Sequence, residues 1–280
     1  MHEINGADIT GYKFADLHMH TTGSLDVRRR TTGLTPQEAV LSGVEAGLSA
    51  LAITDHDNLL SSYEAWNFAE KEGLPIELIP GVEITTRDGH LIGLYLTSSI
   101  PSGLSIAESV RSIHTQSGLA ILPHPGHKHA LTGRKSSLFF EELEQLQAEG
   151  DPDVYFDGVE LYSTGVVDAS RRHKSYVDTN QRTQELYCGN SYRLGAQIGS
   201  SDGHRMTVGR GLTAYKGELI DAIKNKETMA VEMDFEDNRR LVINAVRLFG
   251  SERVLGGMTL EQFEKRVRWQ PHPSSEPLQG

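Results

Sequence analysis

Short apolar runs alternate with amphipathic segments along most of this chain, and this alternation limits the folds that it can adopt. The runs are partly β-branched and bounded by Gly, Pro or Asp, which is typical of buried strands. Repeated strand–helix units predict a mainly parallel α/β sheet, and about seven units favour closure into a barrel over an open sheet. We expect the strands at Lys13–His18, Ala50–Thr54, Ile76–Thr85, Leu91–Leu96, Leu119–Leu122, Gly158–Tyr162 and Gly195–Gly199.

Helix signals lie between most of these runs. Thr35-Pro36-Gln37-Glu38 predicts a helix start, with Thr as the N-cap, Pro in the first turn and Glu at the third position. Gly47 is the candidate for ending that helix. The other helices are expected at Ser62–Lys71, Ser105–Thr115, Leu138–Ala148, His173–Tyr187, Glu218–Lys226, Arg239–Phe249 and Leu260–Arg268.

The composition limits which binding partners, which compartment and which domain organisation we expect for this chain. The chain has 280 residues and a formal net charge of −11, which argues against charge-driven binding to long duplex nucleic acid or an anionic membrane. The lone Cys188 fits a reducing compartment, and we find no signal peptide or membrane-spanning run. We predict a cytoplasmic protein with one barrel domain and C-terminal helices over residues 1–270, followed by a disordered Pro- and Ser-rich tail over 271–280.

Histidine and carboxylate side chains collect where the predicted strands end. The strand ends of a parallel barrel meet at one rim, so residues far apart in the sequence would come together there. A lone histidine is more often an ordinary hydrogen-bonded residue, but repetition at successive strand ends favours a metal site. Imidazoles and carboxylates suit zinc, manganese or iron, and Glu83 is the candidate bridge between two ions. The strand-end residues are His18, His20, Asp55, His56, Glu83, His124, Glu160, Asp202 and His204.

In their residues and in their order along the chain, these motifs resemble those of the PHP (polymerase and histidinol phosphatase) domain family. The matching segments are DLHMHT, ALAITDHDN, IPGVEIT, HLIGLYL, ILPHPG, GVELYS and GSSDGH, from Asp16 to His204, with a weaker match at VGRGLTAYKG. The resemblance implies a distorted (β/α)7 TIM-like barrel with two to three divalent metal ions (Mn, Zn or Fe) at the C-terminal ends of the strands. It also implies a stand-alone, metal-dependent phosphoesterase.

The family pattern assigns ligands to three ions. The first would bind His18, His20, Glu83 and Asp202; the second Glu83, His90 and His124; and the third Asp26, His56 and His204. A hydroxide held beside Glu83 and Asp202 would be the nucleophile. Leu25 places Asp26 one residue further along than in many members, and His90 begins a strand rather than ending one. Asp16 and Asp55 are expected to orient ligand imidazoles through hydrogen bonds, with Glu160 behind the ligands as well.

The loops expected around this rim are basic although the protein is acidic. A guanidinium group matches a phosphate group in a bidentate contact, so such side chains are candidate substrate ligands as well as candidate surface charges. The candidates for substrate binding are Arg134, Arg205, Arg28 and Lys128, and the candidate proton donors are His127 and His129.

Clustered divalent cations polarise a phosphoryl oxygen and lower the pKa of bound water, which suits phosphate-ester hydrolysis. We predict a phosphatase or phosphodiesterase for a small phosphomonoester: a nucleotide, a nucleoside bisphosphate, a histidinol-phosphate-like compound or a short oligonucleotide end. One alternative is an amidohydrolase-like C–N or acyl hydrolase, which the lack of a lysine at the strand ends disfavours. The other is a non-catalytic, metal-stabilised PHP module, which the full ligand set disfavours.

Overall fold

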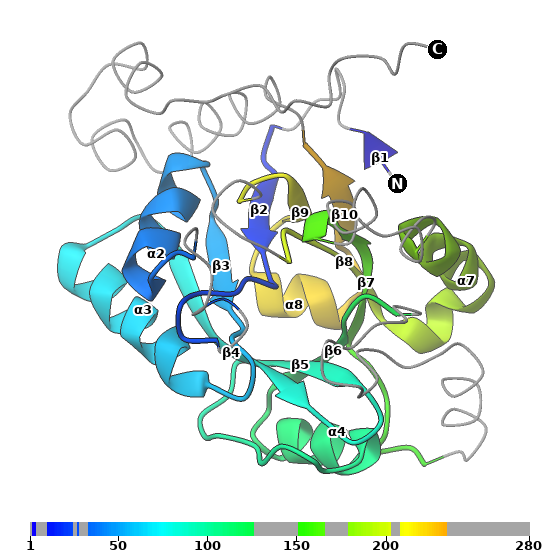
Figure 1. Cartoon of the computed structure of the whole chain (residues 1–280). Coiled ribbons are helices and arrows are strands. Elements are labelled where there is room, and N and C mark those ends of the chain that lie inside the picture. The colour runs from blue at the N-terminus through cyan, green and yellow to red at the C-terminus, as the bar shows by residue number, and fades with distance from the viewer. Residues whose placement is uncertain are drawn as a thin grey trace, which may run out of the picture.

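The strands of this chain form a sheet that curves into a nearly closed barrel, with helices around it (Figure 1). The computed structural model describes residues 2–3, 10–24, 27, 33–125, 151–165, 179–202 and 208–233. The strand order is β1-β10-β9-β2-β3-β4-β5-β6-β7-β8. The bounds are β1 His2–Glu3, β2 Lys13–Asp16, β3 Ala50–Ile53, β4 Glu77–Thr85, β5 His90–Leu94, β6 Leu119–Leu122, β7 Gly158–Ser163, β8 Ala196–Ser200, β9 Gly211–Tyr215 and β10 Met229–Glu232.

Most of the described helices pack outside the ring of strands, while α8 lies behind it in the view of Figure 1. The N-cap predicted at Thr35 is confirmed, because Thr35 Oγ1 accepts from the backbone N–H of Glu38 and the Glu38 carboxylate accepts from that of Thr35. None of the described helices has both the length and the apolar character needed to cross a membrane. The bounds are α2 Pro36–Glu45, α3 Leu59–Glu72, α4 Ile106–Thr115, α7 Thr179–Leu194 and α8 Leu219–Lys224.

The predicted barrel is confirmed, but its sheet is less parallel than expected. Strands β4 and β5 form an antiparallel hairpin with no helix between them, and β5 is also antiparallel to β6. The hairpin turn is stabilised by Thr86 Oγ1, which accepts from the backbone N–H groups of Asp88 and Gly89. Strands β1, β9 and β10 were not predicted. The helices expected over 138–148, 239–249 and 260–268, and the tail 271–280, lie outside the described residues.

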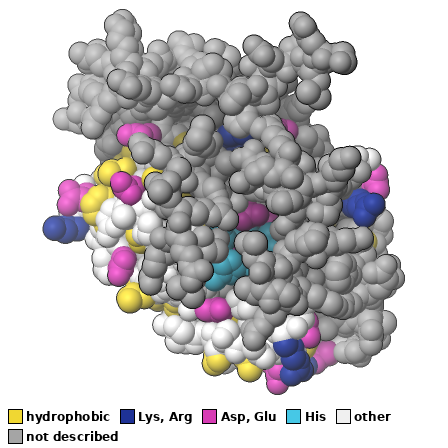
Figure 2. All heavy atoms as spheres, in the orientation of Figure 1, with side chains coloured by type: hydrophobic (Ala, Val, Ile, Leu, Met, Phe, Trp, Pro, Cys, Tyr) yellow, Lys and Arg dark blue, Asp and Glu magenta, His cyan; other side chains and the backbone are white. Residues whose placement is uncertain are grey.

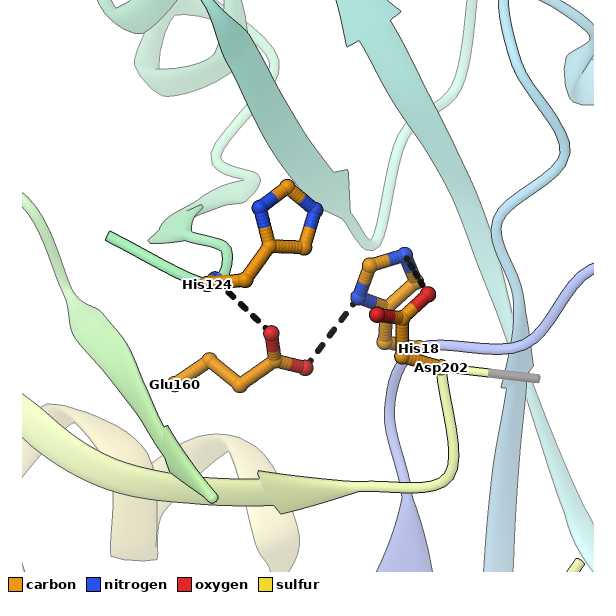
Figure 3. A group of neighbouring side chains, drawn as sticks. All are labelled: His18, His124, Glu160 and Asp202. Atoms are coloured by element: carbon orange, nitrogen blue, oxygen red, sulfur yellow. Dashed lines mark hydrogen bonds and ion pairs between the residues drawn. The ribbon is translucent and has the colours of Figure 1, made fainter. Parts of the chain in front are cut away.

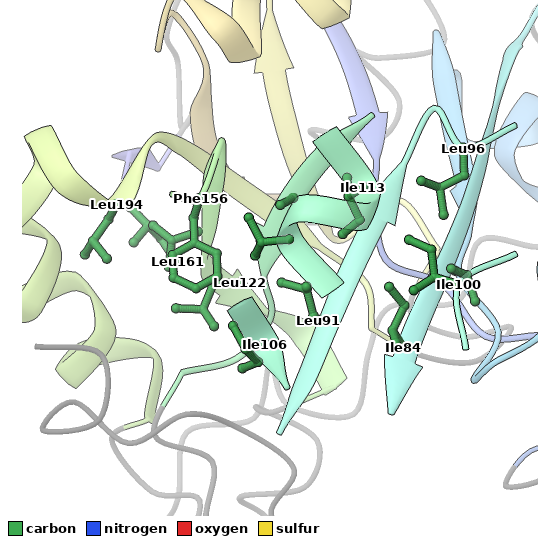
Figure 4. Close-up of a cluster of buried hydrophobic side chains, with 14 of the residues drawn as sticks. Ile84, Leu91, Leu96, Ile100, Ile106, Ile113, Leu122, Phe156, Leu161 and Leu194 are labelled. Atoms are coloured by element: carbon green, nitrogen blue, oxygen red, sulfur yellow. The ribbon is translucent and has the colours of Figure 1, made fainter. Parts of the chain in front are cut away.

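Alternate residues of the strands form two hydrophobic layers. One cluster combines residues from strands all around the barrel, such as Ala52, Ile92 and Ile198, with Leu219 and Ile223 of α8, so it fills the interior. A second cluster lies between the sheet and the helices on one side, where α4 packs against β5 and β6 (Figure 4). Because strands buried on both faces have no polar side, they appear in the sequence as continuous apolar runs.

The barrel closes where β8 meets β9, through the Thr213 side chain and a close approach of the two backbones. Thr213 Oγ1 accepts a hydrogen bond from the Gly199 N–H at 3.1 Å and donates one to the Gly199 carbonyl at 2.9 Å. A Cβ atom on Gly199 would overlap the Leu212 carbonyl oxygen, and one on Gly211 would overlap that of Ser200. Both glycines are therefore needed for this close approach of the two strands.

Gly211→Ala should destabilise the protein by about 3 kcal/mol, since the added methyl group meets backbone that cannot rotate away. The free energy of unfolding from urea titration measures this. Gly43→Ala is the matched control: its Cβ would meet only the ends of side chains, of which Ile76 is the nearest at 3.0 Å, and alanine favours the helix. Equal stabilities for the two variants would contradict the proposed closure contact.

Candidate metal centre

Strand pairing brings His56, Glu83 and His90 to one rim of the barrel. The β3–β4 ladder continues past β3, so that His56 forms a bridge with Glu83, and the Asp57 N–H donates to the Glu83 carbonyl at 2.9 Å. His90 pairs with Thr85 across the β4–β5 hairpin. Because β5 is antiparallel to β4, its first residue lies at the rim where the parallel strands end. This reversal explains how a histidine at a strand start joins ligands at strand ends.

Five imidazoles surround the carboxylate of Glu83, which is only 1% exposed. The three rings that approach Oε2 are those of His18 (Nε2, 3.5 Å), His20 (Nε2, 3.1 Å) and His56 (Nδ1, 3.2 Å). The two that approach Oε1 are those of His90 (Nδ1, 2.9 Å) and His124 (Nε2, 3.2 Å). Each carboxylate oxygen thus has its own set of ring nitrogens, which is the arrangement expected of a bridging ligand.

The separations of these atoms fit a divalent ion. Two ligands of one ion lie about 3.0–3.4 Å apart when each is about 2.1 Å from it. His18 Nε2 and His20 Nε2 are 3.1 Å apart, and both face Glu83. Figure 2 shows histidine side chains gathered near the middle of the rim face, beside acidic side chains. The donor groups that lie close enough together are His18, His20 and Glu83; His56, Glu83 and His90; and His18, His124, Glu160 and Asp202.

Glu160 supports two of these histidines from behind (Figure 3). Its Oε1 accepts from Nδ1–H of His18 at 3.1 Å, and its Oε2 accepts from the backbone N–H of His124 at 2.8 Å. The Ser200 hydroxyl also donates to Oε1. The bond to Nδ1 directs Nε2 of His18 toward Glu83 and Asp202, as carboxylates behind metal-binding histidines commonly do.

Two of the candidate ligands have left-handed backbone conformations. His124 has φ +27° and Asp202 has φ +37°, values that residues other than glycine rarely adopt. Such residues persist only where the surrounding contacts hold them, at a cost of about 1–3 kcal/mol each. The Asp202 N–H donates to the His18 carbonyl, and Glu160 binds the His124 N–H. The cost is therefore offset by contacts inside the same cluster.

Asp16 and Asp55 bind backbone N–H groups, and Asp55 also binds a hydroxyl, whereas we expected both to orient imidazoles. Asp16 Oδ1 accepts from the N–H groups of His18 (3.4 Å) and Ser201 (3.0 Å). Asp55 accepts from both the N–H and the hydroxyl of Thr21. The two carboxyls hold the chain segments that bear the ligands rather than the rings. Burial raises the pKa of Asp16 to about 7.

Several predicted site residues lie outside the described residues. They are Asp26, Arg28, His127, Lys128, His129, Arg134, His204 and Arg205. Of the ligands expected for the third ion, His56 alone is described, and it lies 3.2 Å from Glu83. Ser163, whose hydroxyl donates to Asp202 at 2.9 Å, was not predicted as a site residue. Nothing in GVELYS distinguishes it from a serine that ends a strand without any role in a site.

Comparison with known proteins agrees with this geometry. The sequence matches the family described as PHP domain over residues 16–255. It is 35% identical over 116 residues to an uncharacterized protein of Methanocaldococcus jannaschii (40% of this chain, 67% of that protein). It is 36% identical over 104 residues to the 5′-3′ exoribonuclease Rnm of Salmonella typhimurium (35% of this chain) and spans only 33% of that protein.

A solved structure shares the fold. It is a two-domain protein from Bacteroides vulgatus, described as containing a predicted PHP-like metal-dependent phosphoesterase, with a TM-score of 0.50 and 19% identity. The match covers 85% of this chain and 71% of that one.

Glu83→Gln should remove two equivalents of bound metal, because a neutral amide cannot bridge two cations. Elemental analysis of the purified variant measures the loss. Glu77→Gln, near the other end of the same strand, is the matched control and should keep the parental metal content. Unchanged metal content in Glu83→Gln would refute the bridging role.

Metal affinity should keep increasing as the pH rises above 6.5. Burial alone would lower the pKa of His18, but Asp202, Glu160 and Glu83 outweigh it and hold this pKa well above 6.5. Burial alone would lower the pKa of His124 as well, but the combined effect of Glu83 and Asp202 is larger than this opposing effect, so the pKa of His124 is also raised. An ion binds the neutral ring and must displace these protons. Competition titrations with Mn²⁺ between pH 6.5 and 8.5 test this, and a flat profile would contradict it.

Proposed function

This chain belongs to the PHP domain family, and on that premise we propose that it is a metal-dependent phosphoesterase with its active centre around Glu83. The observation that carries the proposal is the set of five imidazoles on one buried carboxylate. An isolated buried carboxylate would be costly, and so many histidines around one acid exceed what an ion pair needs. Donors of this kind at these spacings suit divalent metals.

We assign the ligands by the family pattern. His18, His20, Glu83 and Asp202 would hold one ion, Glu83, His90 and His124 a second, and Asp26, His56 and His204 a third. Manganese, zinc and iron all suit this donor set. When bound, such ions polarise a phosphoryl oxygen and lower the pKa of water toward neutrality. Glu160 would keep the His18 ring and the His124 backbone in place during turnover.

The charge of the loaded centre would favour a phosphorylated substrate. Two divalent ions would bring four positive charges, whereas the carboxylates of Glu83, Asp202 and Glu160 bring three negative ones. The site would thus be locally positive within a chain of net charge −11. An acidic exterior with a positive centre favours a small anion over a long polyanion, because distant charges repel the rest of a long chain. Arg28, Lys128, Arg134 and Arg205 would add phosphate contacts, with His127 or His129 donating a proton.

We propose a small phosphomonoester, such as a nucleotide, nucleoside bisphosphate or histidinol-phosphate-like compound, or the end of a short oligonucleotide, as the substrate in a cytoplasmic enzyme. The similarity to proteins named 5′-3′ exoribonucleases favours the nucleotide end of this range. The matches cover 33% and 44% of those proteins, so their activity is no more than a guide. The amidohydrolase alternative is less well supported, because no lysine stands at the ligand-bearing strand ends within the described residues.

With Mn²⁺ supplied, the full chain should hydrolyse p-nitrophenyl phosphate or a nucleoside monophosphate, and a chelator should abolish the activity. A panel should compare nucleoside mono- and bisphosphates, histidinol phosphate, a phosphodiester and a 5′-phosphorylated trinucleotide. Complete inactivity of folded protein across this panel with Mn, Zn, Fe and Mg would refute the phosphoesterase proposal. Release of inorganic phosphate from the monoesters alone would indicate a phosphatase. Release of mononucleotides from the trinucleotide would indicate an exonuclease.

A further inference from the structure

Ser163, the last residue of β7, contacts the candidate ligand Asp202. The Ser163 hydroxyl donates a hydrogen bond of 2.9 Å to Oδ2 of Asp202, and its side chain is fully buried. The other carboxylate oxygen, Oδ1, lies 3.5 Å from Nε2 of His18. One oxygen of Asp202 is therefore bound by the protein, and the other faces the imidazoles.

A β-bulge turns Ser163 toward the site. The pairing of β7 with β8 shifts between Glu160 and Tyr162, so that Leu161 is the extra residue. Leu161 and Tyr162 both belong to the hydrophobic cluster between the sheet and the helices, whereas Glu160 and Ser163 contact candidate ligands. Regular alternation would have placed Ser163 on the face opposite Glu160. Bulges commonly re-aim a side chain in this way beside active sites.

Asn180, in the first turn of α7, holds the backbone of Ser163. Its Oδ1 accepts from the Ser163 N–H at 3.2 Å, and its Nδ2 donates to the Ser163 carbonyl at 3.1 Å. One side-chain amide thus binds both backbone groups of a single residue. These two hydrogen bonds fix Ser163 in position, so that α7 is linked to Asp202 through Ser163.

The backbone next to Ser163 also fits closely against Asp202. The Gly165 N–H donates to the Ser201 carbonyl at 2.9 Å, and a Cβ atom on Gly165 would overlap the Asp202 carbonyl oxygen. Asp202 itself has the left-handed φ of +37°. The end of β7 therefore holds this ligand through its side chain and packs against its backbone.

We propose that Ser163 and Asn180 are positioning residues that make Asp202 a ligand through one oxygen only. The hydroxyl binds Oδ2 and leaves Oδ1 for the ion, while Asn180 keeps the hydroxyl in place. This inference rests on the proposed function, since it requires that Asp202 binds a metal ion. Supporting contacts of this kind are typically worth a 10- to 100-fold change in metal affinity or activity.

Ser163→Ala and Asn180→Ala in the full chain test the proposal. Both should bind Mn²⁺ roughly 10- to 100-fold more weakly for one ion per chain in chelator competition. The visible spectrum of the Co²⁺-loaded protein should change in both, because Asp202 becomes free to bind through two oxygens. Ser163→Thr, which retains the hydroxyl, should restore the affinity and the parental spectrum.

Ser62→Ala is the matched control. Ser62 is also buried, and its hydroxyl donates to the Ile79 carbonyl and accepts from the Gly81 N–H. Its loss should lower the free energy of unfolding without changing Mn²⁺ affinity. If Ser62→Ala weakens Mn²⁺ binding as much as Ser163→Ala does, the effect is a general one of removing a buried serine hydroxyl. That result would overturn the positioning role.

Asp202→Asn separates failure of the inference from failure of its premise. If Asp202→Asn weakens Mn²⁺ binding while Ser163→Ala and Asn180→Ala match the parent protein in affinity and Co²⁺ spectrum, the positioning role is refuted and the metal centre stands. If Asp202→Asn also matches the parent, the assignment of Asp202 as a ligand is wrong. Should Ser163→Ala not fold, Asn180→Ala, at a half-buried helix position that leaves the hydroxyl present, decides the question alone.

Discussion

The burial of the Glu83 carboxylate is the constraint on which the rest of the site depends. A carboxylate taken out of water needs compensating partners, and here they are imidazoles from several different strand ends. Burial opposes ionisation of this group, but His56, His90 and His18 outweigh it and keep its pKa well below 4.5. The barrel is thus the frame that brings the partners within reach of one residue.

The parts of the fold that are local in sequence could be predicted well. The apolar runs gave the strands from β2 to β8, because side chains buried on both faces leave a continuous pattern. The helix start at Thr35 was also predictable, since a capping box depends on residues three apart. Strands β9 and β10 were missed because their place in the sheet depends on distant pairing: β9 pairs with β2, about 200 residues away, and β10 pairs with β9.

Those candidate ligands that the structure describes could be predicted as a group, but their supporting contacts could not. Strand-end histidines and carboxylates are conspicuous in sequence, and His18, His20, Glu83 and His124 do lie together. The roles of Asp16 and Asp55 were expected to involve imidazoles, whereas these carboxylates bind backbone N–H groups and the Thr21 hydroxyl. A carboxylate near a ligand can bind either group, and the geometry of the loop decides between them. The position of Ser163 depends on a bulge, which has no distinct sequence signal.

The antiparallel course of β5 also bears on the order in which the centre can assemble during folding. Glu83 and His90 belong to one hairpin, and hairpins form in about 1–10 μs without help from distant chain segments. His18 and Asp202 are far apart in the sequence, so bringing them together costs more loop-closure entropy than closing the hairpin does. We therefore expect the hairpin half of the centre to form before the half that depends on barrel closure. An ion bound by the hairpin residues would be enclosed as the barrel closes around it.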